Sequence, residues 1–472
     1  MAAKNSSRPE QEIVISRRFN APRELLFATW TDPRHLARWW GPAGFTNPIC
    51  EWDARVGGKI HDVMRGPDGT EYPMGGKFRE LVAPERLVMT CGALDGHGVL
   101  LFEFEHAVTF TEQDGVTTVT IRSRLLTATA GAEKYTNGYR AGMTQSLERL
   151  AALAEDMAAR EIVISRVVDA PRELVWAAWT EPKHVVHWWG PRGFSTTIKK
   201  MDFRVGGAWE HTMKGPDGAN YPNKSTFREI VPLERITYSH GGGREDGPGA
   251  SFLATWTFES VQGGKTKLTG RMVFPTAAAR DFVVKEFGAI EGGKQTLERL
   301  GEYLPRMTAK AGEFVISRIL SAPRTLVWTC WTEVKHMAWW GPKGVTLSHA
   351  KLDFRPGGIF HYCLKTPDGH AMWGKWVIRE IDQPQRIVFV NSFSDEAGGL
   401  TRHPGSAQWP LELLSTITFT EQGDQTLVTI RWLPLNASAV EQKTFDEGHA
   451  SMHQGWGGSL DQLTTYLTKP KP

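Results

Sequence analysis

A motif of two adjacent tryptophans followed by Gly-Pro occurs three times in this chain of 472 residues. The copies read Trp39-Trp40-Gly41-Pro42, Trp188-Trp189-Gly190-Pro191 and Trp339-Trp340-Gly341-Pro342. They are separated by 188 − 39 = 149 and 339 − 188 = 151 residues. A solenoid repeat is only about 20–50 residues long, whereas about 150 residues are enough to bury a separate hydrophobic core. The repeat therefore predicts three tandem globular domains.

Composition narrows the classes of protein to consider. The chain has 55 Lys+Arg against 52 Asp+Glu, a net charge of +3, which gives no electrostatic reason to expect nucleic acid. No apolar run approaches the ~20 residues of a membrane span, and the N-terminal residues lack the apolar core of a signal peptide. None of the four cysteines (Cys50, Cys91, Cys330, Cys363) recurs at an equivalent position in another copy. We therefore expect a cytoplasmic protein with no shared disulfide, no metal and no cofactor.

Each copy opens with an alternating strand, at Glu12–Arg17, Glu161–Arg166 and Glu313–Arg318. Asn20, Asp169 and Ser321 follow and are predicted to cap a helix, because each side-chain oxygen accepts a first-turn N–H. A second short helix is predicted to end at the paired tryptophans. Its third copy is one residue shorter, with 8 residues from Trp331 to Trp339 against 9 from Trp30 to Trp39. One helical residue is ~100° of rotation, so the third copy is predicted to present its tryptophans differently or to begin this helix later.

The rest of each copy predicts a meander of about six strands and a closing helix. Pro-Asp-Gly at 67–69, 216–218 and 367–369 predicts a hairpin turn in each copy. Amphipathic helices are predicted at Gly142–Asp156, Gly292–Tyr303 and Gly455–Leu467. A sheet with one buried face needs a cover, which this helix supplies. The prediction is an α+β fold of three helix-grip domains, each a curved antiparallel sheet on a long C-terminal helix with two short helices after the first strand. The domains are predicted at 12–156, 161–304 and 313–468, with connectors at 154–160 and 305–312, a disordered tail at 1–11 and a tail at 469–472.

These motifs are similar to those of a known superfamily. The Ala-Pro-Arg helix start, Trp-Trp-Gly-Pro, Pro-Asp-Gly and the Gly-led final helix resemble the START-like helix-grip superfamily of polyketide cyclases and birch-pollen allergens. More narrowly, each copy resembles the domain named after the C-terminal part of the heat-shock-protein-90 ATPase activator. The resemblance covers almost the whole chain and implies a cavity between sheet and final helix that often holds a small apolar molecule. The activator's chaperone-contacting N-terminal domain has no counterpart in the roughly eleven residues before the first strand, so a chaperone partner lacks that support.

The candidate cavity residues come from three places in each copy. They are the second tryptophan of the pair, the strand after Gly-Gly, and the start of the closing helix: Trp40, Ile60, Met64, Met143, Trp189, Trp209, Met213, Trp340, Phe360 and Trp456. A large ring with one N–H suits the wall of a ligand cavity. The alternative is that both tryptophans only clamp the short helices onto the sheet.

Polar candidates are fewer. His61, Glu210 and His361 share one position, where a titratable side chain would act as a general base or anchor a ligand. Their apolar neighbours predict that this position faces outward. His449 and His453 lie at i, i+4 without a third ligand, so a metal site is not predicted. Gly241–Gly243 reads as a loop that is not a phosphate cradle.

No nucleophile–base pair repeats, so no catalytic residue is predicted, and the leading hypothesis is small apolar-molecule binding in one cavity per domain. One alternative is a cyclase- or hydrolase-like enzyme in which a single copy gathers polar residues in its cavity. Another is a chaperone-ATPase-associated or other protein-binding module. The third copy has 33 residues between Arg386 and Phe419, against 24 between Arg86 and Phe110. This extra segment, around His403 and Trp409, would be a lid, a contact with another domain, or a plain loop.

Overall fold

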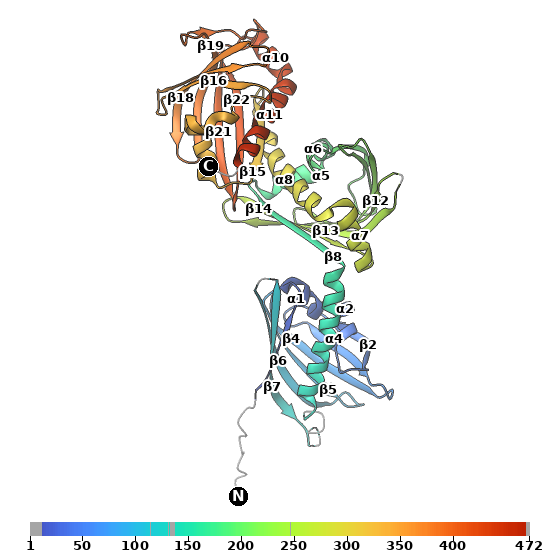
Figure 1. Ribbon diagram of the computed structural model, residues 1–472. Coiled ribbons are helices and arrows are strands. Elements are labelled where there is room, and N and C mark those ends of the chain that lie inside the picture. Colours follow the sequence, from blue (N-terminus) through green and yellow to red (C-terminus); the bar gives the residue numbers. More distant parts are fainter. Residues whose placement is uncertain (1–11, 114, 131, 133–136, 246, 469–472) are drawn as a thin grey trace. The chain divides into compact units, whose positions relative to one another are not determined.

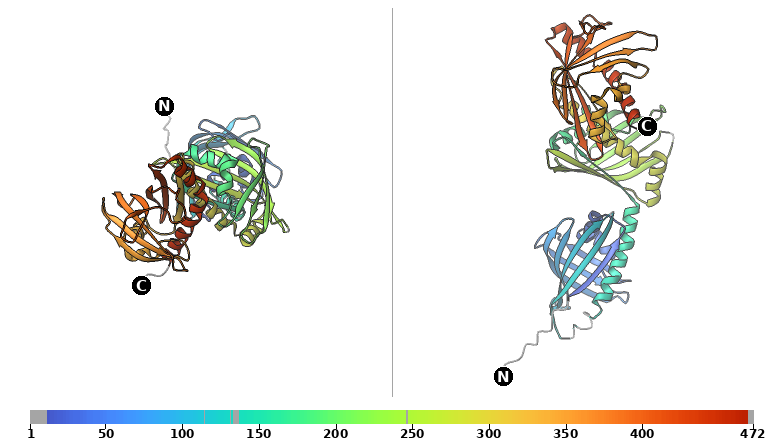
Figure 2. Two further views of the ribbon diagram at one scale, coloured as in Figure 1. Left: turned by 90° about the horizontal axis from the view of Figure 1, so that it is seen from above. Right: turned by 60° about the vertical axis from the view of Figure 1, so that its left-hand side comes forward.

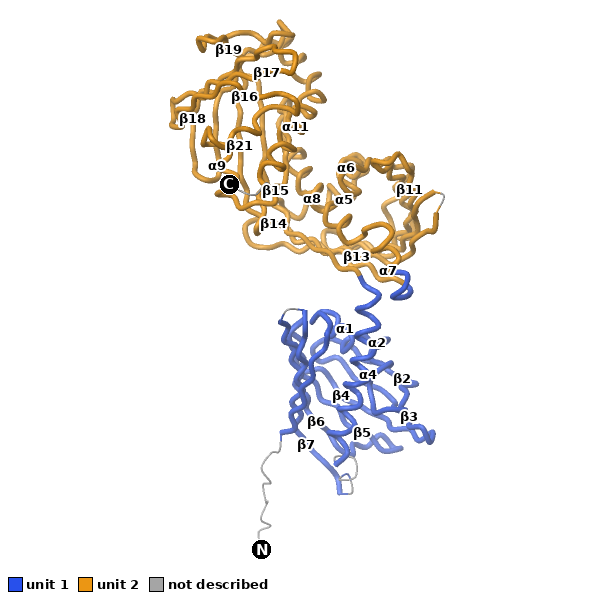
Figure 3. The backbone as a smooth tube through the Cα atoms, viewed as in Figure 1, with its two compact units in different colours: residues 1–161, 275–280 blue, residues 162–274, 281–472 orange. Residues whose placement is uncertain are grey.

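The computed structural model describes residues 12–113, 115–130, 132, 137–245 and 247–468. The predicted tails at 1–11 and 469–472 lie outside the described residues. The chain forms two compact units, residues 1–161 with 275–280 and residues 162–274 with 281–472 (Figure 3). Domain 1 belongs to the first unit, and most of domain 2 together with domain 3 belongs to the second.

The order of elements repeats from domain to domain (Figure 1). Domain 1 contains β1 (Ile13–Phe19), α1 (Arg23–Thr31), α2 (Pro33–Trp39), β2 (Thr46–Trp52), β3 (Lys59–Arg65), β4 (Glu71–Val82), β5 (Arg86–Leu94), β6 (Leu100–Gln113), β7 (Val116–Ala128) and α4 (Tyr139–Ala159). Domain 2 contains β8 (Glu161–Val168), α5 (Arg172–Thr180), α6 (Pro182–Trp188), β9 (Ser195–Met201), β10 (Ala208–Lys214), β11 (Asn220–Val231), β12 (Arg235–Gly243), β13 (Gly249–Val261), β14 (Lys265–Val273), α7 (Ala277–Phe287) and α8 (Ala289–Met307). Domain 3 contains β15 (Phe314–Leu320), α9 (Arg324–Thr332), the 3₁₀ helix η1 (Val334–Trp339), β16 (Thr346–Leu352), β17 (Ile359–Lys365), β18 (Ala371–Asp382), β19 (Arg386–Ser394), β20 (Leu400–Thr401), β21 (Glu412–Gln422), β22 (Gln425–Leu435), α10 (Ala439–Glu447) and α11 (His449–Thr468).

The three sheets share one antiparallel topology, which confirms the predicted α+β helix-grip fold. In domain 1 the strand order is β1-β7-β6-β5-β4-β3-β2, so the first strand pairs with the last and the others form a meander. Domains 2 and 3 repeat this order, with β20 as a short addition beside β19. Each sheet bends around its own closing helix, α4, α8 or α11 (Figure 2). In domain 1, Leu147 and Leu150 of α4 belong to the same buried core as Phe78, Val108 and Phe110 of the sheet.

The prediction for the start of the first helix is wrong. Asn20, Asp169 and Ser321 do not cap it, because the N-cap residues are Pro22, Pro171 and Pro323, with no side-chain cap. A residue that precedes proline is held out of the helical region, so the alanine before each of these prolines cannot be helical. The helix therefore begins only at the arginine that follows.

The shorter third copy takes neither predicted route. Its second helix begins directly after Glu333, as α2 begins after Asp32, but it winds as a 3₁₀ helix. Six 3₁₀ residues turn about 720° and seven α-helical residues about 700°, so the tighter winding offsets the missing residue. The Trp331 ring lies 5.0 Å from Trp339 and 5.9 Å from Trp340, against 4.8 and 6.0 Å from Trp30 to Trp39 and Trp40. The tryptophans are thus presented alike.

The closing helices are longer than predicted and reach into the predicted connectors. α4 begins at Tyr139 and ends at Ala159, and α8 runs from Ala289 to Met307. The connectors predicted at 154–160 and 305–312 are therefore partly helical, which is a correction. Gly241–Gly243 is also not a loop, because these residues end β12 and pair with β13. The helices α7 and α10, which precede the closing helices of domains 2 and 3, were not predicted.

A side chain of the closing helix holds the Trp-Trp-Gly-Pro corner. In domain 1, Arg149 Nη1 donates to the carbonyls of Gly41 and Pro42 at 2.9 and 3.0 Å. In domain 2, Arg299 donates to Gly190, Pro191, Phe194 and His187. Domain 3 has a neutral version, in which the Gln462 amide donates to the Gly341 carbonyl. The corner is therefore a backbone turn whose exposed carbonyls are satisfied from the closing helix.

This contact gives a first testable prediction. Arg299→Leu leaves four carbonyls without their donor and is expected to lower the free energy of unfolding of domain 2 by about 2 kcal/mol. Arg299→Gln is expected to cost about half as much, because an amide at the equivalent position still donates in domain 3. Urea titration with pulsed hydrogen exchange of α6 and β9 peptides measures both. The exposed substitution Lys294→Leu on the same helix is the control, and an equal effect at both positions would contradict the prediction.

Within the second unit, α8 also packs on the first strand of domain 3. β15 is buried on both faces, since Val315, Ser317 and Ile319 of its outer face are 4–6% exposed, whereas Val14 of β1 is 37% exposed. Glu302 of α8 accepts from the backbone N–H of Ile319 at 2.8 Å. A side chain at Gly301 would lie 3.5 Å from Ile319. α8 therefore packs both in the core of domain 2 and against the first strand of domain 3.

Candidate ligand cavities

A cavity of about 320 Å³ lies between the sheet and the closing helix of domain 1. Its wall is formed by Trp40 and Pro42 of the corner, by inward side chains of β3 to β6, and by Tyr139 and Met143 of α4. Most of these side chains are apolar. The position and lining suit a small apolar ligand, since binding pockets of about 300–1,000 Å³ are common.

Domain 3 has a larger cavity, of about 560 Å³, in the corresponding place. It is lined by Trp340, Tyr362, Trp376, Phe389, Trp432 and Trp456 together with residues of the extra segment and of α10. His403, Ser406 and Trp409 of the extra segment belong to this wall. Arg402 ties the segment to α10 through a 2.6 Å contact with Glu441. The extra segment thus covers the cavity of its own domain.

In domain 2 the ring of Trp256 packs against Trp189, the corner tryptophan whose counterparts line the other two cavities. Trp256 on β13 lies opposite Gly270 on β14, and its ring is 5.8 Å from Trp179 and 6.4 Å from Trp189. Its indole N–H donates to the Tyr238 hydroxyl at 3.2 Å. A side chain at Gly270 would meet the Trp256 ring at 2.6 Å, so this ring and this glycine are complementary.

The two tryptophans of each pair have different roles. Trp39, Trp188 and Trp339 are almost completely buried, and each donates its indole N–H at 3.0 Å to a carbonyl of the preceding helix. The second ring faces the space under the sheet: Trp40 and Trp340 line the two cavities, and Trp189 donates to His211 at 3.1 Å. The first ring anchors the short helices and the second is available to a ligand.

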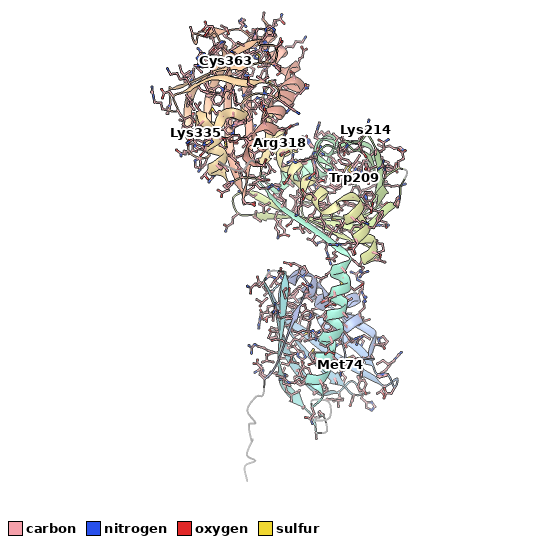
Figure 4. All side chains as sticks on the ribbon, viewed as in Figure 1. Met74, Trp209, Lys214, Arg318, Lys335 and Cys363 are labelled. Carbon is pink, nitrogen blue, oxygen red and sulfur yellow. The ribbon has the colours of Figure 1, made fainter. Side chains whose placement is uncertain are left out.

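The other apolar candidates divide between cavity walls and core. Met64 and Met143 line the cavity of domain 1, and Trp456 lines that of domain 3. Ile60 and Phe360 are buried at 2% and 0% exposure without belonging to either wall. In domain 2, Trp209 is 0% exposed, lies within its domain (Figure 4) and is stacked on His211, while Met213 would touch a side chain at Gly190.

The three polar candidates all lie on the outer face of the sheet. His61 Nδ1 is 3.1 Å from the carboxylate of Glu51, and both side chains are exposed. Glu210 lies between Lys199 and Lys224, at 3.8 and 3.4 Å. His361 stacks on Trp373 and contacts the Asp395 carbonyl at 3.2 Å. None of them lines either cavity.

Sequence reasoning missed the titratable residue one position further along each strand. Asp62, His211 and Tyr362 all point inward, two residues after Ile60, Trp209 and Phe360, and alternation of side chains along a strand would have found them. Burial raises the pKa of Asp62 to about 6. The hydrogen bond that its Oδ1 accepts from Trp52 at 3.2 Å has the opposite, smaller effect. Burial lowers the pKa of His211 to about 3 and raises that of Tyr362. One inward position therefore carries an acid, a neutral base and a phenol in the three domains.

A second polar group lies in the wall of the domain 1 cavity. The Ser123 hydroxyl is 2.9 Å from His106 Nδ1 and 2.6 Å from the Tyr139 hydroxyl, which is itself 3.2 Å from His106 Nδ1. Burial lowers the pKa of His106 to about 4, so the imidazole is neutral at pH 7, and burial raises the pKa of Tyr139. His106 and Tyr139 line the cavity, with Ser123 behind them.

The histidine pair before the last helix packs against an aromatic ring. His449 and His453 lie 5.6 and 4.6 Å from the ring of Phe314. Among the described residues, no group of three or more His, Cys, Asp or Glu side chains is placed to hold a metal ion.

Fold and cavities together define a protein of three START-like helix-grip domains. The sequence matches one family over residues 20–155, 169–305 and 321–468, and that family is described as Activator of Hsp90 ATPase homolog 1-like protein. Each stretch lies within one of the three domains, beginning just after its first strand, and together they cover most of the chain. The chain therefore belongs to this family.

Solved structures of single-domain length are similar to parts of the chain. A protein from Arthrobacter aurescens is 26% identical over 32% of this chain and 89% of its own, with a TM-score of 0.30. A protein from Mycobacterium smegmatis is 25% identical over 34% and 93%, with a TM-score of 0.29, and one from Silicibacter pomeroyi is 26% identical over 30% and 96%, with a TM-score of 0.26. No curated protein matches the chain. No helix among the described residues is long and apolar enough to cross a membrane.

Proposed function

We propose that this chain binds small apolar molecules in the cavities of domains 1 and 3, with domain 2 as a filled scaffold. The observation that carries the proposal is the pair of cavities, about 320 and 560 Å³, each walled by mostly apolar side chains between sheet and closing helix. Both cavities are open to solvent, so a ligand can enter them, and mostly apolar pockets of about 300–1,000 Å³ are typical of small-molecule sites. The sequence hypothesis of one cavity per domain is narrowed to two, because Trp256 packs against the corner tryptophan in domain 2.

Native mass spectrometry of the full-length protein tests this proposal. The purified chain is expected to carry extra mass that organic solvent removes, or, once stripped, to bind the neutral apolar dye Nile red in two sites. A stripped chain that binds neither Nile red nor any component of an apolar extract would overturn the proposal.

A second candidate is an enzyme that uses domain 1 alone. The hydrogen-bonded group of His106, Ser123 and Tyr139 supports it, since this is the one cavity wall of the two that combines a neutral imidazole with a hydroxyl behind it. A neutral histidine in an enclosed wall is suited to accept a proton. Turnover of activated apolar esters is its direct assay. A role with a chaperone stays a prediction, for which stimulation of chaperone ATPase activity is the assay.

A further inference from the structure

The wall of the domain 3 cavity carries aromatic rings where domain 1 carries smaller or more flexible side chains. Phe389 lies opposite Ile378 just as Met89 lies opposite Phe78, so the two occupy one position of the fold. Trp376 lies opposite Phe360 in domain 3, where Gly76 lies opposite Ile60 in domain 1. Trp456 follows Gly455 of α11 as Met143 follows Gly142 of α4.

These extra rings belong to the buried core of domain 3, and a space remains beside them. Larger side chains at equivalent positions would be expected to reduce an internal space, yet the cavity of domain 3 is about 560 Å³ and that of domain 1 about 320 Å³. The space persists because His403 and Trp409 of the extra segment extend its wall outward. The rings therefore form a surface that faces an open space.

Several of these rings meet at steep angles, whereas Trp376 and Phe389 are stacked at 4.2 Å and 20°. Trp340 meets Trp376 at 4.8 Å and 83°, and it meets Trp456 at 5.5 Å and 74°. Trp432 lies 5.4 Å from Trp456 at 73°. Rings in crossed planes offer both faces and edges to a flat guest, and aromatic pairs prefer such edge-to-face or offset contacts.

The electrostatics of the wall point to an uncharged guest. No Asp, Glu, Lys or Arg is among the described residues that line the cavity. Its one histidine, His403, has a pKa lowered by burial, so it is neutral at pH 7. A buried charge without a partner is costly, which disfavours an ionic ligand.

We propose that the cavity of domain 3 binds an uncharged, planar aromatic molecule, a proposal that rests on the ligand-binding function proposed above. The four features that carry it are the added rings, the crossed planes of several ring pairs, the persisting space and the absence of charge from the described wall. Domain 1 has glycine or methionine at these three positions and a polar group in its wall, so it offers different contacts to a ligand.

Calorimetric titration of the stripped full-length chain with 2-naphthol and with decahydro-2-naphthol tests the proposal. Both probes have the same carbon skeleton and hydroxyl, and only the first is planar and aromatic. We expect 2-naphthol to bind about tenfold more tightly, the effect of one good aromatic pair. Tetraethylammonium is a third probe, and binding of this cation more tightly than 2-naphthol would overturn the proposal.

A matched pair of variants locates the site. Phe389→Met with Trp456→Met gives domain 3 the methionines that domain 1 has at these positions, and methionine tolerates such exchanges in cores. The preference for 2-naphthol is expected to disappear in this variant, while decahydro-2-naphthol binds as before. The control is Phe104→Leu, which removes a ring from the wall of domain 1 and should leave the preference unchanged.

The outcomes separate this proposal from the function on which it rests. If neither naphthol binds, and Nile red also does not, both proposals fail. Equal binding of the two naphthols would overturn the aromatic preference and leave apolar binding standing. A preference that survives Phe389→Met with Trp456→Met, or that is lost in Phe104→Leu, would place the aromatic site outside domain 3.

Discussion

Asp62→Asn is expected to stabilise domain 1 by about 3 kcal/mol at pH 7.5 and to have little effect near pH 4. Asp62 is 0% exposed, and burial raises its pKa to about 6 from an ordinary 3.8. The folded state therefore holds this proton more tightly than the unfolded chain. Stability from this group is present below about pH 4, falls as the pH rises to about 6, and stays low above it. A difference of about 2 pKa units corresponds to about 3 kcal/mol.

The asparagine variant isolates this effect because its amide stands in for the protonated acid. Its oxygen can still accept from the Trp52 indole, as Asp62 Oδ1 does. Urea titrations at pH 4, 6 and 7.5, read by pulsed hydrogen exchange of β3 and β4 peptides, follow domain 1 alone. Glu71→Gln on β4 is the control, because its half-exposed ion pair with Arg65 is expected to contribute less than about 1 kcal/mol at any pH. An Asp62→Asn effect that is independent of pH would contradict the assignment.

The inward position of Asp62 could have been predicted from the sequence. Alternation along the strand turns His61 outward and Asp62 inward. A buried carboxyl in a wall of apolar side chains is an unusual arrangement, and a charged residue between Ile60 and Met64 in the sequence was its only signal.

The topology was predictable because its determinants are local. Pro-Asp-Gly sets the hairpin between β3 and β4 and its counterparts in the other domains, and the paired tryptophans mark the corner that the closing helix covers. Features that depend on compensation between residues were not predictable in the same way. The 3₁₀ winding of η1 offsets a missing residue, and a proline, not Asn20, sets the start of α1. Periodicity reports which face a residue lies on, but it does not report how a helix adjusts its pitch.

Whether a core is filled or contains a cavity was the least predictable feature, because it depends on residue pairs that lie far apart in sequence. Trp256 faces Gly270 in domain 2, whereas the same rung holds Val108 with Ile121 in domain 1 and Ile417 with Ile430 in domain 3. Read singly, Trp256 would be one more aromatic candidate for a cavity wall. Only the register of β13 against β14 shows that a glycine makes room for it.

The cross-strand pair in domain 2 gives the largest expected effects, in a double-mutant cycle. Trp256→Val should lower the free energy of unfolding of domain 2 by about 3–5 kcal/mol, because it removes a ring that is 3% exposed and leaves the Tyr238 hydroxyl without its donor. Gly270→Ile should cost about 3 kcal/mol, because its Cβ would lie 2.6 Å from the Trp256 ring, which Trp179 and Trp189 hold in place.

The double variant, Trp256→Val with Gly270→Ile, is expected to lose less free energy of unfolding than the two single variants lose together, by at least about 2 kcal/mol. It recreates the branched pair of domains 1 and 3, in which one side chain fills the space that the other leaves. Urea titration with pulsed hydrogen exchange of β13 and β14 peptides provides the four free energies. Thr257→Val and Thr269→Val, paired on the adjacent rung of the outer face, form the control cycle, and their coupling should stay within the ~1 kcal/mol of a cross-strand pair. Additive costs for Trp256 and Gly270 would mean that the ring and the glycine are independent, and that the filled core of domain 2 has another cause.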